Sequence, residues 1–200
     1  MYLTLTAQNP RNSDYLAEDG HVLYKVDKPS GFSAKTATIR KSMTGKSKGA
    51  NEQYAFYAQV EFHDWSDTQF LLDNRSIPAS EFLQKDSGWF SGGKRTFTAS
   101  DGRQYTWKPY GKHLEMYRND GTKTLMVKFT EYRPGLGPFM KKRLASLEID
   151  STCIPILDEV ILTFIYCEKL RKDRNRAAAN SAAASSAAAS SSAAAAAASC

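Results

Sequence analysis

Cysteine is scarce in this chain, and its spacing excludes the sites that cysteine usually builds. The three cysteines are Cys153, Cys167 and Cys200. Their number is odd, and no two of them stand at the short spacing of a zinc or redox motif. Residues 1–10 also lack the basic start and the long apolar run of a secretory signal. We therefore expect a reduced, cytoplasmic protein without a disulfide framework.

Catalytic motifs are missing as well. The sequence holds no Ser-His-Asp signature, nucleophile elbow, phosphate-binding glycine loop or sensibly spaced set of metal ligands. Glu61 and His63 share a strand face and could form an acid–base pair, but a half-exposed strand pair is the simpler interpretation. We expect no enzyme, no cofactor and no metal.

The composition is that of a packed domain over most of the chain. Apolar residues make up 42%, aromatic residues 12% and charged residues 24% of the whole. Residues 177–200 differ, because they contain only Ala, Ser, one Asn and the final Cys, and so have no large apolar side chain to bury. We predict one domain over residues 1–176. The Ala/Ser-rich tail at 177–200 is expected to be frayed or disordered in solution.

Short alternating segments separated by turns dominate the domain. The clearest hairpin joins Arg95–Ser100 to Arg103–Trp107 through Asp101-Gly102, a pair that supplies the positive φ angles of a tight turn. A second hairpin joins His113–Tyr117 to Leu125–Phe129. Such strands, about ten in all at this spacing, indicate an all-β sandwich or barrel.

One segment breaks the strand pattern and predicts a helix over residues about 155–174. It begins with Pro155, continues with acidic residues and ends in a basic cluster, as the two ends of a helix dipole favour. No residue between Val160 and Cys167 is charged, so the helix is apolar on every side there and must be buried. The stretch is too short for a bilayer, which needs about 20 apolar residues. We therefore predict a mainly β fold, a closed antiparallel β-barrel of about 10–12 strands around this helix.

Four parts of the sequence carry a resemblance to a known family. They are Asp19-Gly20 with Leu23-Tyr24-Lys25, Phe62-His63, residues 95–107, and residues 157–174 with their Glu-Lys-Leu-Arg-Lys-Asp-Arg ending. Over most of residues 1–176 the chain resembles a family of fungal domains of unknown function, found largely in mushroom-forming species. That family is more distantly similar to the tubby C-terminal barrel superfamily, which includes phospholipid scramblases and plant LURP-one-related proteins. The resemblance implies a closed barrel around a hydrophobic C-terminal helix, and fold analogy alone is a weak argument for function.

Clusters of basic residues are the best functional signal. The net charge of +6 favours anionic partners. Three clusters stand out, and one of them is the end of the predicted helix, residues 169–176, which is rich in lysine and arginine. We take the residues of the other two as the candidate ligand-binding residues. These are Arg40, Lys41, Lys46 and Lys48 in one cluster, and Lys141, Lys142 and Arg143 in the other. If the clusters met at one end of the barrel they would bind anionic headgroups, each cation contributing about 1 kcal/mol near an anionic leaflet. The simpler alternative is a set of solvated faces that keep the protein soluble.

Three functions remain open at this point. The preferred hypothesis is a non-catalytic binding module for an anionic phospholipid surface or an acidic protein, which would place a cytoplasmic protein at the periphery of membranes. A structural or protein-interaction domain, tethered by the Ala/Ser tail, is the alternative. An enzyme has the least support, since it rests only on Glu61, His63 and Asp64 lying close in sequence. Nucleic acid is disfavoured, because no aromatic residues interleave with the basic runs.

Overall fold

The computed structural model describes residues 1–29, 35–43, 53–63, 65–86, 93–135 and 142–197. Within them, thirteen strands form a single antiparallel sheet in the order β7-β6-β5-β4-β3-β2-β1-β13-β12-β11-β10-β9-β8. The elements are β1 (Tyr2–Leu5), β2 (Ser13–Leu16), β3 (Val22–Asp27), β4 (Thr36–Ser42), β5 (Tyr54–Glu61), β6 (Gln69–Leu72), β7 (Arg75–Pro78), α1 (Ala79–Phe82), β8 (Gln84–Lys85), β9 (Arg95–Thr98), β10 (Gln104–Tyr110), β11 (His113–Arg118), β12 (Leu125–Thr130), β13 (Ser146–Ile149), the 3₁₀ turn η1 (Ser151–Ile156) and α2 (Leu157–Ala197).

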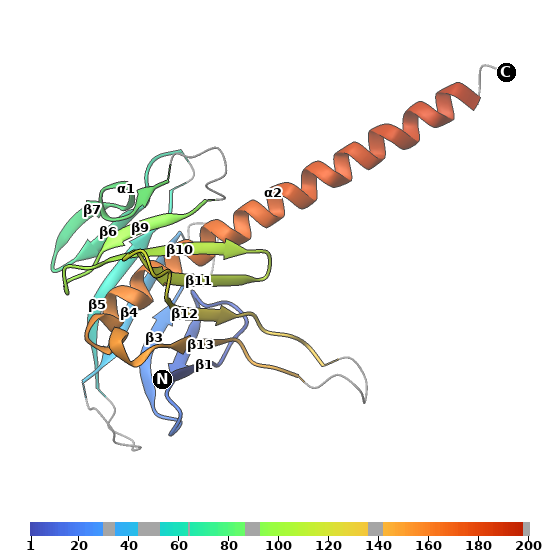
Figure 1. Ribbon diagram of the computed structural model, residues 1–200. Coiled ribbons are helices and arrows are strands. Elements are labelled where there is room, and N and C mark those ends of the chain that lie inside the picture. The colour runs from blue at the N-terminus through green and yellow to red at the C-terminus, as the bar shows by residue number, and fades with distance from the viewer. Residues whose placement is uncertain (30–34, 44–52, 64, 87–92, 136–141, 198–200) are drawn as a thin grey trace.

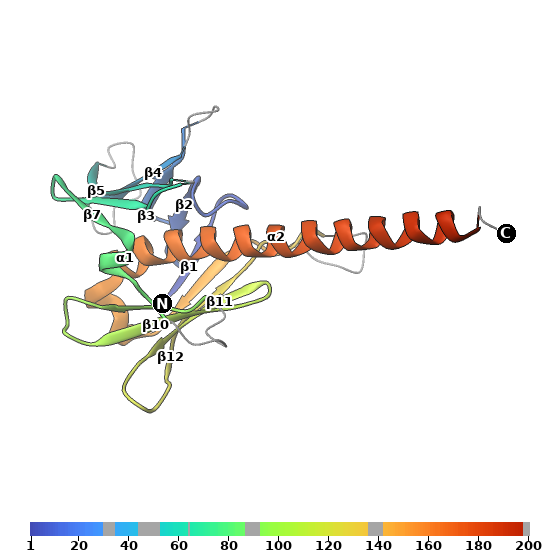
Figure 2. The ribbon, with the colours of Figure 1, turned by 90° about the horizontal axis from the view of Figure 1, so that it is seen from above.

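Two meanders, β1–β7 and β8–β13, make up the sheet and join where the first strand pairs with the last. Leu3 of β1 lies opposite Leu147 of β13 in that pair. The sheet curves around the first part of α2, which then leaves it and projects away (Figure 1). Seen from above, α2 passes between the β3–β5 side and the β10–β12 side (Figure 2). The predicted mainly β fold with a C-terminal helix is confirmed, as are both predicted hairpins.

Strand pairing does not close the sheet within the described residues. Its order ends at β7 on one side and at β8 on the other, so the expected closed barrel is not shown. The short helix α1 connects these two edges instead. The ring of Phe82 in α1 lies 5.6 Å from that of Phe70 in β6 and 6.3 Å from that of Phe97 in β9. We call this junction between the β7 edge and the β8 edge the seam. At the seam β7 ends at Pro78, which has no N–H to donate to a further strand.

The apolar middle of α2 is the centre of the core. Val160, Ile161, Leu162, Phe164 and Ile165 are fully buried. The ring of Phe164 lies 6.4, 6.0 and 4.8 Å from aromatic rings on three different strands, those of Tyr15, Trp107 and Phe129. The expectation of a helix buried in protein is therefore confirmed. Among the described residues, no helix combines the length and apolar character that crossing a membrane requires.

A buried ion pair fixes α2 where it leaves the sheet. Arg171 Nε and Nη2 donate to the two Glu168 carboxylate oxygens at 2.7 and 2.9 Å, and both side chains are almost fully buried. Arg171 also bonds to Glu131, beyond β12, and to the backbone oxygen of Gly111 in the β10–β11 turn. Burial raises the pKa of Glu168, and the contact with Arg171 opposes that rise. We call the end of the domain where α2 leaves the sheet, at Glu168 and Arg171, the helix-exit end. The opposite end, where α2 begins, is the helix-start end.

The helix differs from its prediction at both ends. It begins at Leu157, after η1, and continues to Ala197 instead of ending near Arg174. Alanine has the highest helix propensity. The hydroxyls of Ser181 and Ser185 donate to backbone oxygens three and four residues earlier, both at 2.9 Å, so these serines do not interrupt the helix. Residues 174–185 are exposed.

Replacing Phe164 by Asp should unfold the domain. A buried unpaired charge costs several kcal/mol against a total stability of about 5–15 kcal/mol. Circular dichroism during thermal melting would show no cooperative transition. Phe56→Asp is the control, because Phe56 is 47% exposed and its replacement should cost about 1 kcal/mol or less. A cooperatively melting Phe164→Asp variant would contradict the buried-helix core.

Replacing Phe82 by Ala tests the seam. We expect a loss of about 2–3 kcal/mol in the free energy of unfolding, slightly below the range for a fully buried Phe, because Phe82 is partly buried. Urea denaturation would measure the loss. The control Phe56→Ala should change the stability by less than about 0.5 kcal/mol. Equal stability of the two variants would mean that α1 does not hold the edges together.

Candidate functional site: a cationic groove on the outer sheet face

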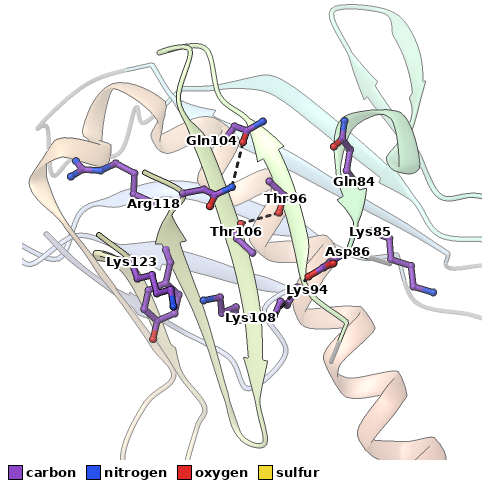
Figure 3. Close-up of a pocket in the computed structure, with 12 residues that line it drawn as sticks. Gln84, Lys85, Asp86, Lys94, Thr96, Gln104, Thr106, Lys108, Arg118 and Lys123 are labelled. Atoms are coloured by element: carbon purple, nitrogen blue, oxygen red, sulfur yellow. Dashed lines mark hydrogen bonds and ion pairs between the residues drawn. The ribbon is translucent and has the colours of Figure 1, made fainter. Parts of the chain in front are cut away.

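A polar groove of about 420 Å³ lies on the outer face of strands β8–β11 (Figure 3). Five of the residues that line it are basic and one is acidic. The basic residues are Lys85, Lys94, Lys108, Arg118 and Lys123, and the acidic residue is Asp86. We refer to these six residues and the space between them as the β8–β11 groove. It holds an excess of positive charge.

Strand alternation explains why polar side chains gather on this face. Tyr105 and Trp107 of β10 point into the core and are buried, so their neighbours Thr106 and Lys108 point outward. Thr106 pairs with Thr96 of β9, and their hydroxyl oxygens are 2.9 Å apart. The floor of the groove is therefore a row of hydroxyl groups between cations.

Three lysines of the groove interact through their like charges. Lys123, Lys108 and Lys94 lie across it in Figure 3. Burial lowers the pKa of Lys108, and the like charges of Lys94 and Lys123 lower it further. The Nζ atom of Lys108 lies 4.4 Å from the centre of the Tyr117 ring, which gives it a cation–π contact. An anion placed among these ammonium groups would relieve their mutual repulsion.

The carboxylates around the groove neutralise only part of this charge. Lys94 Nζ lies 3.8 Å from Asp86 Oδ2, and Arg118 is ion-paired with Asp120 at the far end. Within the part of the chain that the structure describes, Lys85 and Lys123 make no ion pair. The groove therefore keeps unneutralised cations that an anionic ligand could contact.

The described members of the two predicted clusters are not brought together. Arg40 is ion-paired with Asp27, and Lys41 Nζ lies 2.7 Å from Asp158 Oδ2 at the helix-start end. Lys142 and Arg143 lie in the connection between β12 and β13, which leaves the sheet at the helix-exit end beside Glu131. The Nζ atom of Lys142 lies 5.9 Å from the centre of the Tyr132 ring. The described parts of the two clusters thus belong to opposite ends of the domain.

Three other predicted residues, Lys46, Lys48 and Lys141, lie outside the described residues. Ligand binding by the predicted set therefore stays a prediction. Lys41 has a structural role in addition, because its ion pair holds β4 against the start of α2.

The candidate acid–base pair is a surface contact. His63 Nε2 lies 4.0 Å from Glu61 Oε2, and both side chains are about 40% exposed, at 40% and 43%. Among the residues with described positions, no three His, Cys, Asp or Glu side chains gather as metal ligands would. The geometry at Glu61 and His63 is that of a solvated surface pair where β5 ends, since Glu61 is the last residue of the strand and His63 lies beyond it.

Sequence analysis missed the groove because its cations are scattered along the chain. Three of them lie in strands and two in connections, and no two are adjacent: Lys85, Lys108 and Arg118 belong to β8, β10 and β11, whereas Lys94 precedes β9 and Lys123 lies between β11 and β12. Strand alternation in β10 places Lys108 outward, but only the order β11-β10-β9-β8 brings the others beside it. A search for charge runs cannot find such a cluster.

Comparison with known proteins gives a match to one sequence family. The sequence pattern of a family described as a family of unknown function, DUF6593, matches residues 8–173. No curated protein and no solved structure matches the chain significantly. The match includes the groove and ends where the exposed part of α2 begins.

Removing a neighbouring cation should raise the pKa of Lys108. Lys94→Ala or Lys123→Ala removes a like charge that lowers this pKa, so the titration of Lys108 should move to higher pH. Carbon-13 NMR of the lysine Cε signals would measure it. Lys142→Ala removes the same charge elsewhere and should leave the titration of Lys108 unchanged. A shift in none of the variants would mean that the three lysines do not interact.

Proposed function

We propose that this chain, which belongs to the DUF6593 family of unknown function, is a non-catalytic binding module that docks on anionic phospholipid surfaces. One observation carries the proposal: five cations and one carboxylate line the β8–β11 groove, and two of these cations, Lys85 and Lys123, make no ion pair among the described residues. The net charge of +6 adds long-range attraction to an anionic surface. The proposal places the protein on the cytoplasmic side of membranes, as a peripheral protein.

Phosphate groups match the chemistry of the groove. Lysine ammonium groups bind phosphate as point charges, and the guanidinium of Arg118 offers two parallel donors. The hydroxyls of Thr96 and Thr106 lie between these cations and supply further donors. A phosphate in the groove would thus gain both charge neutralisation and hydrogen bonds.

The finer fold interpretation that we propose is a barrel of the tubby-like kind. The sequence resemblance supports it, and so does the seam, where Phe82 contacts rings from both halves of the sheet. Because α2 fills the interior, docking in such a barrel would use the outer surface, where the groove lies.

A protein-interaction domain is the second candidate. The exposed Ala/Ser-rich part of α2, residues 177–185, favours it, because a partner could bind this exposed helical surface. An acidic protein could also use the groove. Charge alone does not separate this candidate from the lipid proposal, so the experiment below uses vesicles without protein.

Neutralising the groove should abolish most of the binding to anionic vesicles. The full chain is floated with phosphatidylcholine vesicles that contain phosphatidylserine, and with phosphatidylcholine alone, at low and physiological salt. The triple variant Lys94→Ala, Lys108→Ala, Lys123→Ala should bind about 100-fold more weakly, since each cation contributes about 1 kcal/mol near an anionic leaflet. Binding by the wild type should fall with salt.

A second triple variant is the matched control. Arg40→Ala, Lys142→Ala and Arg143→Ala remove the same net charge from residues outside the groove. This variant should lose much less affinity. Equal losses would show that total charge, not the groove, controls binding, and wild-type protein that does not float with anionic vesicles would refute the proposal.

A further inference from the structure

Positive charge accumulates where α2 leaves the sheet, away from the residues of the proposed groove. Residues 169–176 of α2 contain five basic residues and one acidic residue. The acidic residue, Asp173, is ion-paired with Lys169. Arg174 and Arg176 are exposed, and neither makes an ion pair within the described parts of the chain. The helix-exit end therefore carries cations that the fold does not neutralise.

A polar pocket of about 330 Å³ lies beside this part of α2. Its residues come from the β1–β2 connection, the end of β12 and α2, and they are Gln8, Asn9, Glu131, Tyr132 and Lys172. We call these five residues and the space between them the exit pocket. Asn9 Oδ1 accepts from the backbone N–H of Arg11 at 3.3 Å, so the NH₂ group of Asn9 is the part that remains for a ligand.

The one carboxylate that lines the exit pocket is already engaged, because Glu131 is ion-paired with Arg171. Lys172 Nζ lies 3.6 Å from Glu168 Oε1, which is longer than a hydrogen bond. That carboxylate already accepts two shorter bonds from Arg171, at 2.7 and 2.9 Å. Lys172 is 35% exposed, so its ammonium group can still donate to a ligand in the pocket.

Arg176 extends the positive charge of the exit pocket along α2. It lies four residues after Lys172, so the two side chains share one side of the helix. Burial lowers the pKa of Arg11; the charge of Asp173 opposes this shift, and that of Arg176 adds to it. Arg11 and Arg176 are therefore close enough for their like charges to repel. An anion on this side of α2 would relieve that repulsion.

We infer that the exit pocket and Arg176 bind an acidic polypeptide segment, which places an Asp or Glu side chain in the pocket and runs along the Lys172–Arg176 side of α2. This site goes beyond the proposed function and does not rest on it. A carboxylate accepts hydrogen bonds only, and the groups that remain for a ligand here are the donors of Asn9 and Lys172. Bonds between a cation and a carboxylate are about twice as strong as neutral ones.

The shape of the helix-exit end favours a polypeptide over a bilayer. Beyond the exit pocket, α2 continues and projects away from the sheet (Figures 1 and 2). A flat membrane approaching this end would meet the projecting helix first, whereas an extended chain can lie beside it. Single-stranded nucleic acid gains affinity by stacking on aromatic rings. The exit pocket has one such ring, Tyr132, and Lys142 Nζ already lies 5.9 Å from its centre.

Calorimetric titration with a synthetic peptide tests the inference. The probe is a peptide of alternating Glu and Gly, and a peptide of alternating Gln and Gly of equal length is the uncharged comparison. The full chain should bind the Glu peptide with an affinity that falls with salt, and should not bind the Gln peptide. The double variant Lys172→Gln, Arg176→Gln should bind the Glu peptide about tenfold more weakly, a change of about 1.4 kcal/mol.

A second double variant, Arg174→Gln with Lys94→Gln, removes the same charge from the opposite side of α2. The Arg174 guanidinium lies where a Cβ atom of Gly93 would be, beside Lys94 and away from the exit pocket. This control should lose less than about twofold in affinity for the Glu peptide. Equal losses in the two double variants would refute the site. Tighter binding of a single-stranded oligonucleotide than of the Glu peptide would refute the polypeptide as its occupant.

Vesicle flotation separates this site from the proposed function. The double variant Lys172→Gln, Arg176→Gln should float with anionic vesicles as the wild type does. Thermal melting establishes that it folds, and the single variant Arg176→Gln, at an exposed position, takes its place if it does not. Wild-type protein that floats with the vesicles but does not bind the Glu peptide refutes the exit pocket alone. Peptide binding without flotation refutes the lipid proposal alone.

Discussion

The burial of α2 is the constraint on which the rest of the structure depends. A helix that is apolar on all sides cannot lie on a sheet with one face in water, so the sheet must curve around it. The pairing of β1 with β13 allows this, because it joins the two meanders into one continuous wall. Thr163, a polar residue in the buried part of α2, has hydrogen-bond partners there. Its hydroxyl accepts from Trp107 Nε1 at 2.9 Å and donates to Glu159 O at 2.7 Å.

The charges at the two ends of the buried segment fix its position along the sheet. At the start, Asp158 bonds to Tyr24 and Lys41, and the Glu159 carboxylate accepts from the backbone N–H and the hydroxyl of Ser100 at 3.0 Å each. Burial raises the pKa of Tyr24, and its hydrogen bond to Asp158 raises it further. At the exit, Arg171 connects the helix to two strand ends. These polar contacts at both ends add to the apolar packing in fixing the helix register.

The sequence allowed the buried helix to be predicted because residues 160–167 contain no charge, a local pattern with one physical solution. The hairpins were equally local, since Gly102 and Gly121 adopt the positive φ angles, +76° and +84°, that their turns need. The open seam and the groove depend on strand order, which short-range patterns do not contain. Whether Arg40 and Lys41 lie near Lys142 and Arg143 depends on strand order in the same way, because distance along the chain says nothing about which end of a sheet a loop leaves.

Filling the interior with α2 has a consequence for recognition. A curved sheet often holds its ligand inside, but here Phe164 and its neighbours occupy that space, so binding is left to the outer faces, edges and loops. On the outer face, β9 and β10 form a rigid floor, while the lysines above it are long and flexible. An anionic ligand bound there would gain charge neutralisation from these lysines but little geometric discrimination between phosphate esters.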